Sequence, residues 1–158
     1  MHMIHMTCPG HEDATLEGYI LDCELTLGQE TKRPAVVVCP GGGYLYCSPR
    51  EAEPVALRYA AAGFHAFILR YSTESKAAGN APLAEVNWAV SLLREQADEW
   101  HIDPGKIAVC GFSAGGHLCG SLAIMYAYPE VKAAFGDKYA LVKPTGAILA
   151  YPVTVTGE

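Results

Sequence analysis

Long apolar runs and basic clusters are both missing from this sequence. No stretch approaches the roughly 20 apolar residues that a membrane-spanning helix needs, and residues 1–15 contain neither the basic nor the apolar part of a secretory signal. Lysine and arginine number 11 against 17 aspartates and glutamates, which gives a net charge of −6. Because no basic cluster is available to neutralise phosphates, nucleic acid is excluded as a partner. We expect a cytoplasmic protein that binds neither a membrane nor nucleic acid.

Paired cysteine motifs are also absent. No CxxC pair occurs among the six cysteines, which lie in ordinary apolar segments: Cys8, Cys23, Cys39, Cys47, Cys110 and Cys119. Without a secretory signal, such cysteines are expected to be free thiols rather than disulfides. His2, His5 and His11 lie near Cys8, but their spacing matches no arrangement of metal ligands. We therefore expect no metal and no cofactor, and a flexible or loosely attached N-terminus over residues 1–13.

An apolar content of 51% in 158 residues is enough to bury the core of one domain. No repeat, linker or low-complexity segment divides the chain, so residues 1–158 are expected to form a single domain. Short runs rich in valine and isoleucine predict strands buried on both faces of a parallel sheet, at residues 35–39, 65–71, 106–110 and 146–151. Residues 14–25 alternate loosely in polarity and predict an earlier, antiparallel strand.

The clearest helical pattern covers residues 82–100, where apolar residues return every three or four positions. Asn80 is the expected cap of this helix, and Pro82 would lie in its first turn. Strands that alternate with helices predict an α/β fold with a mostly parallel sheet.

A second helix is expected after the glycine-rich stretch, ending at Gly63. Its start remains open. Ser48 and Glu51 have the spacing of a capping box, whereas Pro54 would interrupt a helix begun at Ser48.

The stretch CGFSAGG at residues 110–116 contains the pattern GxSxG, formed by Gly111, Ser113 and Gly115. It follows a predicted strand and precedes a helical stretch at residues 114–127, which is the context that a nucleophile elbow requires. At such a sharp turn, larger neighbours would collide with the strand and the helix, and the helix dipole favours a developing oxyanion. We therefore predict Ser113 as a catalytic nucleophile. The alternative is that the pattern arises by chance or that Ser113 only caps the helix.

A second glycine-rich stretch, PGGGY at residues 40–44, follows another predicted strand. A tetrahedral intermediate needs two or three backbone N–H groups directed at one oxygen, and glycines let the chain approach that closely. The predicted donors of this oxyanion hole are Gly42, Gly43 and Ala114. A dinucleotide-binding loop would need a glycine in place of Tyr46, and both stretches lack the GK[ST] ending of a P-loop. A glycine-rich turn without a function is the alternative.

These motifs resemble the first half of an α/β-hydrolase of the esterase and lipase group, close to acetyl esterases and acetylxylan esterase-like enzymes. The resemblance rests on residues 40–72, 99–118 and 146–153, and it covers the chain from about residue 14. It implies a three-layer fold and a serine hydrolase of small esters that uses no cofactor. Pro40 replaces the histidine that precedes the glycines in many lipases, which leaves the glycine amides unaffected.

The acid and the base of an α/β-hydrolase triad follow the nucleophile along the chain. After Ser113 the only histidine is His117, which lies one helical turn away and points along the helix, so we expect it to have a packing role. His65 and His101 are also expected to be structural. The resemblance thus implies that the acid and the base lie beyond Glu158, and that C-terminal strands and helices of the fold are missing. We expect little or no esterase turnover from residues 1–158 alone.

Three functional hypotheses remain. The first is a serine esterase that acts on a small-molecule ester, such as an acylated sugar. The second is a catalytically incomplete fragment or a hydrolase-like interaction module. The third is a serine peptidase of the prolyl-oligopeptidase type, which would ordinarily carry a large additional domain. Without a further strand, residues 146–151 would form an exposed apolar sheet edge, so we expect the chain to form homo-oligomers or to aggregate through it.

Overall fold

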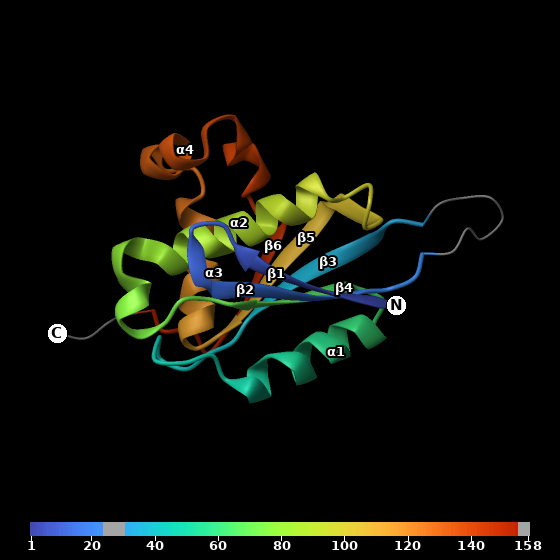
Figure 1. Cartoon of the computed structure of the whole chain (residues 1–158), viewed down its shortest axis with the longest axis horizontal. Helices are drawn as coiled ribbons and strands as arrows, with labels where there is room; N and C mark the ends of the chain where they lie inside the picture. Colours follow the sequence, from blue (N-terminus) through green and yellow to red (C-terminus); the bar gives the residue numbers. More distant parts are fainter. Residues whose placement is uncertain (24–30, 155–158) are drawn as a thin grey trace.

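Six strands form one mixed sheet in the computed structural model, which describes residues 1–23 and 31–154 (Figure 1). In their order across the sheet they are β1 (His2–Cys8), β2 (His11–Ile20), β4 (His65–Arg70), β3 (Arg33–Cys39), β5 (Ile102–Phe112) and β6 (Gly146–Ala150). β1, β2 and β4 pair antiparallel, whereas β4, β3, β5 and β6 run parallel to one another. The prediction of an α/β fold with a mostly parallel sheet is confirmed.

Helices cover both faces of this sheet and give the molecule three layers (Figure 1). On one face, α1 (Glu53–Ala61) packs against β4 and β3. On the other face, α2 (Ala81–Glu95) contacts α3 (Ala114–Met125), which packs against β5 and β6. The remaining helical segments are α4 (Pro129–Phe135) and the short 3-10 helices η1 (Pro49–Glu51), η2 (Glu74–Asn80) and η3 (Gly136–Leu141).

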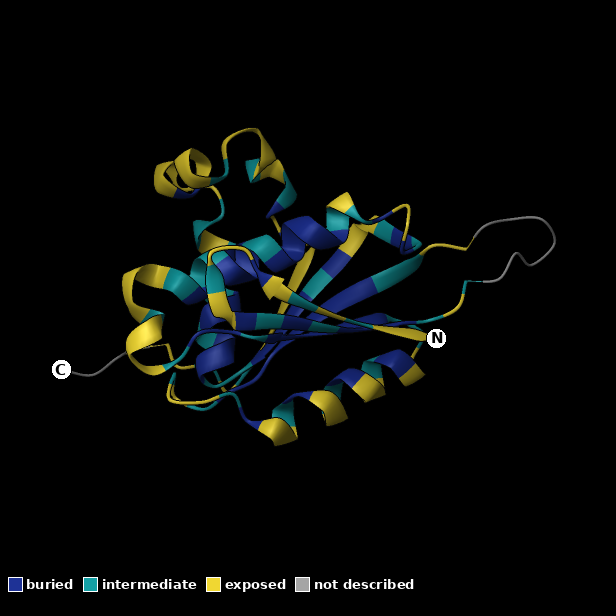
Figure 2. Cartoon of the chain, in the orientation of Figure 1, coloured by how far each residue is buried: buried dark blue, intermediate teal, exposed yellow. Residues whose placement is uncertain are grey.

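Successive residues of β3 and β4 belong to two different cores, because alternate side chains of a strand point to opposite faces. Val36 and Ile68 pack on the side of α1, where the small residues Ala56 and Ala60 let the helix lie close to the sheet. The other core includes Val37, Phe67, Leu69, Val86, Val90, Leu118 and Leu122. Burial on both faces, visible as dark blue strands in Figure 2, confirms the prediction for residues 35–39 and 65–71. For residues 146–151 the predicted burial is wrong, because β6 lies at the end of the sheet and four of its five residues are exposed.

The prediction that residues 1–13 form a flexible N-terminus is wrong. These residues form β1 and the beginning of β2, which pair antiparallel with His2 opposite Ile20. Ile4 and Met6 alternate with exposed residues and pack against the core on the side of α2. In the sequence of β1, a few apolar residues are interspersed with histidines, which is a weak indication of a strand. The segment is stabilised as a strand by pairing with β2.

Two other predicted elements have different bounds. β2 ends at Ile20 rather than at residue 25, and residues 24 and 25 lie outside the described part of the chain. α2 carries Pro82 in its first turn as predicted, but it ends at Glu95 instead of residue 100. The predicted cap at Asn80 is wrong. Its backbone is left-handed, with φ 63°, and its side chain makes no capping hydrogen bond, whereas an N-cap needs an extended backbone.

α1 begins at Glu53, which places Pro54 in the first turn, where a missing N–H group leaves no hydrogen bond unmade. The alternative start with a capping box at Ser48 is wrong, because the Ser48 side chain makes no capping hydrogen bond. Glu51, the other half of that pattern, contacts a different segment that is described below. Gly63 follows the helix with φ 92°, so the predicted end is confirmed.

Two expectations concern the chain as a whole. All six cysteines are free thiols, as predicted, and four of them are buried. None of the helices in residues 1–23 and 31–154 has both the length and the apolar character needed to cross a membrane.

β6 lies at one end of the sheet and, within the described residues, pairs only with β5. Ile148 and Leu149 are 47% and 43% exposed, so this edge is apolar as well as unpaired. We expect the purified 158-residue chain to self-associate through β6, and the charged variant Ile148→Lys to shift it toward monomer. Sedimentation velocity over a range of protein concentrations measures this.

Leu57→Lys is the matched control, since Leu57 is 43% exposed but lies on α1, away from any strand edge. A chain that sediments as a monomer, or one that both substitutions dissociate equally, would contradict association through β6.

Candidate active site

Ser113 lies between the end of β5 and the start of α3 in a strained backbone conformation, with φ 50° and ψ −112°. Residues other than glycine rarely adopt a positive φ, and such strain persists only when surrounding contacts fix it. Here three backbone hydrogen bonds do so. The Ser113 N–H donates to the oxygen of Ala150 at 3.0 Å, and its carbonyl accepts from His117 at 2.9 Å and from Val153 at 3.2 Å. The sequence-based expectation of a strand, a sharp turn and a helix at this position agrees with the geometry.

The glycines around Ser113 are required by space. A Cβ atom on Gly111 would lie 2.1 Å from the oxygen of Gly115, and one on Gly115 would lie 2.0 Å from the oxygen of Cys39. The backbones of β5, α3 and the end of β3 therefore touch directly. A side chain at either glycine would force these three elements apart.

We expect Gly115→Ala to lower the free energy of unfolding by about 3 kcal/mol, because a clash with backbone oxygen cannot be relieved by rotating a side chain. Gly146→Ala is the control, since a Cβ there meets nothing within 4 Å and the position has no positive φ. Urea unfolding followed by circular dichroism measures both variants. Equal stability of the two variants would show that the close approach is not needed.

The glycine loop that follows β3 lies against this elbow. A Cβ on Gly41 would be 3.2 Å from the Cβ of Ser113 and 2.9 Å from the oxygen of Phe112. Gly42 and Gly43 follow with φ 136° and 64°, which is backbone that glycine adopts readily. The turn is closed by a hydrogen bond of 3.0 Å from the Leu45 N–H to the Gly42 oxygen.

The amides proposed as oxyanion donors are not used by the fold. Within the described residues, the N–H groups of Gly42, Gly43 and Ala114 donate no hydrogen bond to a protein acceptor, whereas that of Gly41 donates to Glu51 at 2.8 Å. Ala114 is the first residue of α3, where an amide has no partner inside the helix. The structure brings the glycine loop and the start of α3 together around Ser113.

His117 lies in α3 and packs against Tyr44 of the glycine loop, which fits the packing role predicted for it. Its Nδ1 lies 2.8 Å from the hydroxyl of Tyr44, and the two rings meet edge to face. Tyr44 itself has φ 60°, so the loop remains strained up to this contact. Among the described residues, the Ser113 hydroxyl has no hydrogen bond to a histidine.

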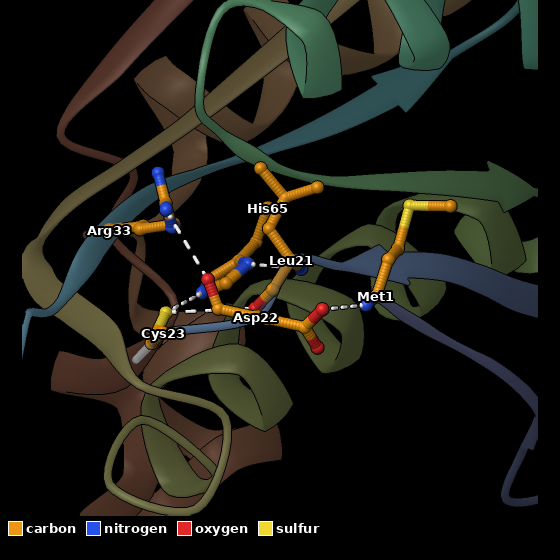
Figure 3. A network of polar contacts seen from close by, with 6 residues as sticks. All are labelled: Met1, Leu21, Asp22, Cys23, Arg33 and His65. Atoms are coloured by element: carbon orange, nitrogen blue, oxygen red, sulfur yellow. Dashed lines mark hydrogen bonds and ion pairs between the residues drawn. The ribbon is translucent and has the colours of Figure 1, made fainter. Parts of the chain in front are cut away.

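His65 is buried at the opposite end of the parallel strands, at the first residue of β4 (Figure 3). Its Nδ1 accepts the N–H of Leu21 at 3.0 Å, and its Nε2 lies 3.3 Å from the oxygen of His101. Burial lowers the pKa of the His65 imidazole, so the neutral form is favoured. This network connects strand ends, and the structural role predicted for His65 fits it.

A cavity of about 320 Å³ opens beside His117, between the start of α2 and the outer side of α3. Its lining includes Tyr44, Asn80, Leu83, His117, Ser121 and Met125. A further hollow of about 410 Å³ lies between α3 and β6 and shares His117 with the first. Small-molecule sites are commonly concave and mostly apolar with a few polar groups, which describes the first cavity. In residues 1–23 and 31–154, no three His, Cys, Asp or Glu side chains are grouped as metal ligands.

Comparison with known proteins assigns the chain to a family. The profile of the BD-FAE family matches residues 21–147, which include the glycine loop and Ser113. The chain belongs to the BD-FAE family. Its BD-FAE region has the α/β-hydrolase fold: the structure of MGS-M1, an α/β-hydrolase enzyme from a Medee basin deep-sea metagenome library, superimposes with a TM-score of 0.83 at 39% identity. That match covers 100% of this chain and 60% of the MGS-M1 chain.

Two relatives of this chain carry functional names. The chain is 39% identical over 134 residues to endo-1,4-beta-xylanase B of Butyrivibrio fibrisolvens, covering 82% of this chain and 21% of the relative. It is 29% identical over 125 residues to the acetylxylan esterase of Xylanibacter ruminicola, covering 78% of this chain and 23% of the relative. The chain thus spans about a fifth of the length of these relatives.

Two residues at this site have no motif in the sequence. In the sequence, Tyr44 is only the last residue of PGGGY, and Glu51 is marked only by its spacing from Ser48. The Tyr44 side chain connects the glycine loop to His117 of α3, and the Glu51 carboxylate accepts a hydrogen bond from Gly41 of the loop. An aromatic residue and a carboxylate in these positions have many possible roles, so the contacts become visible only in the fold.

Proposed function

We propose that this protein is a serine carboxylic-ester hydrolase with Ser113 as its nucleophile. The observation that carries the proposal is the strained Ser113 backbone at the start of α3, with unused amides of the glycine loop packed beside it. Membership of the BD-FAE family and the relationship to an acetylxylan esterase support the same reaction. The fold alone would not, because α/β folds host many chemistries.

In the proposed mechanism the Ser113 oxygen attacks the ester carbonyl carbon, and its proton passes to a base. The carbonyl oxygen becomes negatively charged and is bound by the amides of Gly42, Gly43 and Ala114, where each donor contributes roughly 3 to 4 kcal/mol to lowering the barrier. The bond to the alcohol then breaks, and the alcohol leaves with a proton. Water attacks the remaining acyl-enzyme, releases the acid and restores the serine.

The base is proposed to come from outside these 158 residues. Three of the histidines within the chain already have other contacts: His11 binds Glu85 at 2.8 Å, His65 lies between Leu21 and His101, and His117 contacts Tyr44. A serine without a positioned base is a weak nucleophile, although donors to the oxyanion retain some acceleration.

The proposed substrate is a short acyl ester, preferably acetyl, of a sugar or similar small alcohol. The acetylxylan esterase relative supports the acyl group. The cavity beside His117 supports a small alcohol, since its tyrosine, asparagine and serine side chains offer hydroxyl and amide groups to hydroxyls of a ligand.

The nucleophile can be tested by labelling the full-length gene product with a fluorophosphonate. We expect one adduct, at Ser113, because an elbow serine beside free amides is the most reactive hydroxyl. Peptide mapping by mass spectrometry locates the adduct. Ser113→Ala should abolish labelling, and Ser75→Ala, at an exposed position of η2, should leave it unchanged. Labelling at another residue would rule out Ser113, and a protein that takes no label would favour a non-catalytic interaction module.

The acyl preference can be tested with nitrophenyl esters of different chain length. We expect kcat/KM for the acetate to exceed that for the decanoate by roughly ten-fold or more, because a small acyl site gains little from a long chain and must still order it. Steady-state hydrolysis by the full-length gene product measures the ratio. Faster turnover of the decanoate would show that the protein prefers long-chain esters.

A further inference from the structure

The carboxylate of Glu51 links two segments of the candidate site, and the proposed mechanism gives this carboxylate no role. It ends η1, and its Oε2 accepts the N–H of Gly41 at 2.8 Å. Its Oε1 accepts the hydroxyl of Tyr151, which follows β6, at 2.8 Å. Glu51 forms no ion pair with another described residue, so these two hydrogen bonds are what hold its carboxylate.

Gly41, whose N–H group binds the Glu51 carboxylate, lies next to Ser113. A Cβ on Gly41 would lie 2.7 Å from Glu51 Oε2 and 3.2 Å from the Cβ of Ser113. Glu51 and Ser113 therefore both lie close to Gly41. A larger residue at position 41 would displace one of them.

Hydrogen bonds fix the peptide planes of the loop one after another. A peptide group is planar, so a bond to its C=O also sets the direction of its N–H. The plane that carries the Gly42 N–H is held by the Ser48 N–H on the Gly41 oxygen at 2.8 Å. The plane that carries the Gly43 N–H is held in the same way by Leu45.

The plane before these two is held by side chains. It consists of the Pro40 carbonyl and the Gly41 N–H. The Tyr71 hydroxyl donates to the Pro40 oxygen at 2.6 Å, and Glu51 accepts from Gly41. Both the C=O and the N–H group of the first peptide of the loop are thus hydrogen-bonded to side chains. The orientation of this peptide sets the position of the glycines that follow.

We propose that Glu51 is a positioning residue for the oxyanion loop: its carboxylate binds the Gly41 amide and so directs the amides of Gly42 and Gly43 toward the reacting oxygen. This inference rests on the proposed function of Ser113. In this role Glu51 acts through the length of its side chain, which places an acceptor oxygen at the Gly41 N–H group. Its negative charge lies near the position where the oxyanion develops and would oppose that charge.

Three substitutions separate reach from charge. Glu51→Gln keeps an acceptor oxygen at the same distance and removes the charge. Glu51→Asp keeps the charge and withdraws the carboxylate by one methylene. Glu51→Ala removes both. The matched control is Glu53→Ala, which removes an equal charge and a hydrogen bond of 2.7 Å to Tyr19, away from the glycine loop.

We expect Glu51→Gln to keep kcat within about three-fold of the wild type, since a neutral acceptor can still hold the Gly41 N–H. Glu51→Asp and Glu51→Ala should lower kcat on the order of ten- to a hundred-fold, as displacement of a catalytic group by about 1 Å does. KM should change little, because the affected donors act on the transition state. Glu53→Ala should match the wild type. Nitrophenyl acetate hydrolysis by the full-length gene product, per site titrated with fluorophosphonate, measures these values.

A second measurement reports the oxyanion loop directly. A trifluoromethyl ketone forms a reversible adduct with the nucleophile and places an oxyanion where the amides bind. Its inhibition constant should rise for Glu51→Asp in proportion to the loss of kcat/KM, and should stay unchanged for Glu51→Gln. A role in stability alone would leave the inhibition constant of the folded, titrated sites unaltered.

The inference is overturned if Glu51→Asp retains the wild-type rate while Glu51→Gln loses it, since charge would then be the property that matters. It is also overturned if Glu51→Ala is fully active. Should Glu51→Ala fail to fold, the comparison of Gln with Asp decides alone. Failure of the proposed function looks different: hydrolysis would then persist in Ser113→Ala, whatever the Glu51 variants do.

Discussion

The contact of backbone with backbone at Gly115 is the constraint on which the rest of the site depends. The first turn of α3 lies so close to the end of β3 that a Cβ on Gly115 would be 2.0 Å from the oxygen of Cys39. This approach lets the glycine loop, which leaves β3 at the next residue, lie beside Ser113. If the helix moved outward by the width of a methyl group, Ser113 and Gly41 would separate, and the glycine loop would no longer lie beside the proposed nucleophile.

The order of the strands brings further segments of the candidate site next to this backbone contact. β3 lies between β4 and β5 in the sheet, and β6 lies beyond β5, all four parallel. Segments that leave their carboxyl ends therefore meet at one edge: the glycine loop after β3, Ser113 after β5 and Tyr151 after β6. Ligands of open α/β sheets bind at this edge for the same reason. Glu51 and Tyr151, a hundred residues apart in the chain, come within hydrogen-bonding distance here.

Much of this arrangement could be predicted from the sequence, and the exceptions have a common cause. The strands at residues 35–39, 65–71 and 106–110 are apolar on both faces, so their burial is evident without knowing their neighbours. The elbow and the glycine loop can also be predicted from the sequence, because the crowded backbone at these positions has room only for glycine. β1 is not predictable in this way, since its few apolar residues become a buried face only when β1 pairs with β2.

Side-chain partners far apart in sequence account for the remaining differences. Ser48 and Glu51 have the spacing of a capping box, and the same spacing is compatible with a carboxylate that turns away from the helix toward Gly41. A pattern of two residues cannot distinguish these outcomes. The position of Asn80 likewise suggested a cap, but its left-handed backbone directs the chain into α2 without the help of the side chain.

The strain at Ser113 links the proposed nucleophile to the end strand of the sheet. A non-glycine residue in such a conformation costs on the order of 1 to 3 kcal/mol, which the surrounding hydrogen bonds must offset. Two of the three come from Ala150 and Val153, at the end of β6 and just after it. The backbone geometry of Ser113 thus depends on how firmly β6 is held, and β6 is an end strand with exposed Ile148 and Leu149. A segment or partner that pairs with β6 would stabilise the strained conformation of Ser113, whereas loss of β6 from the sheet would release it.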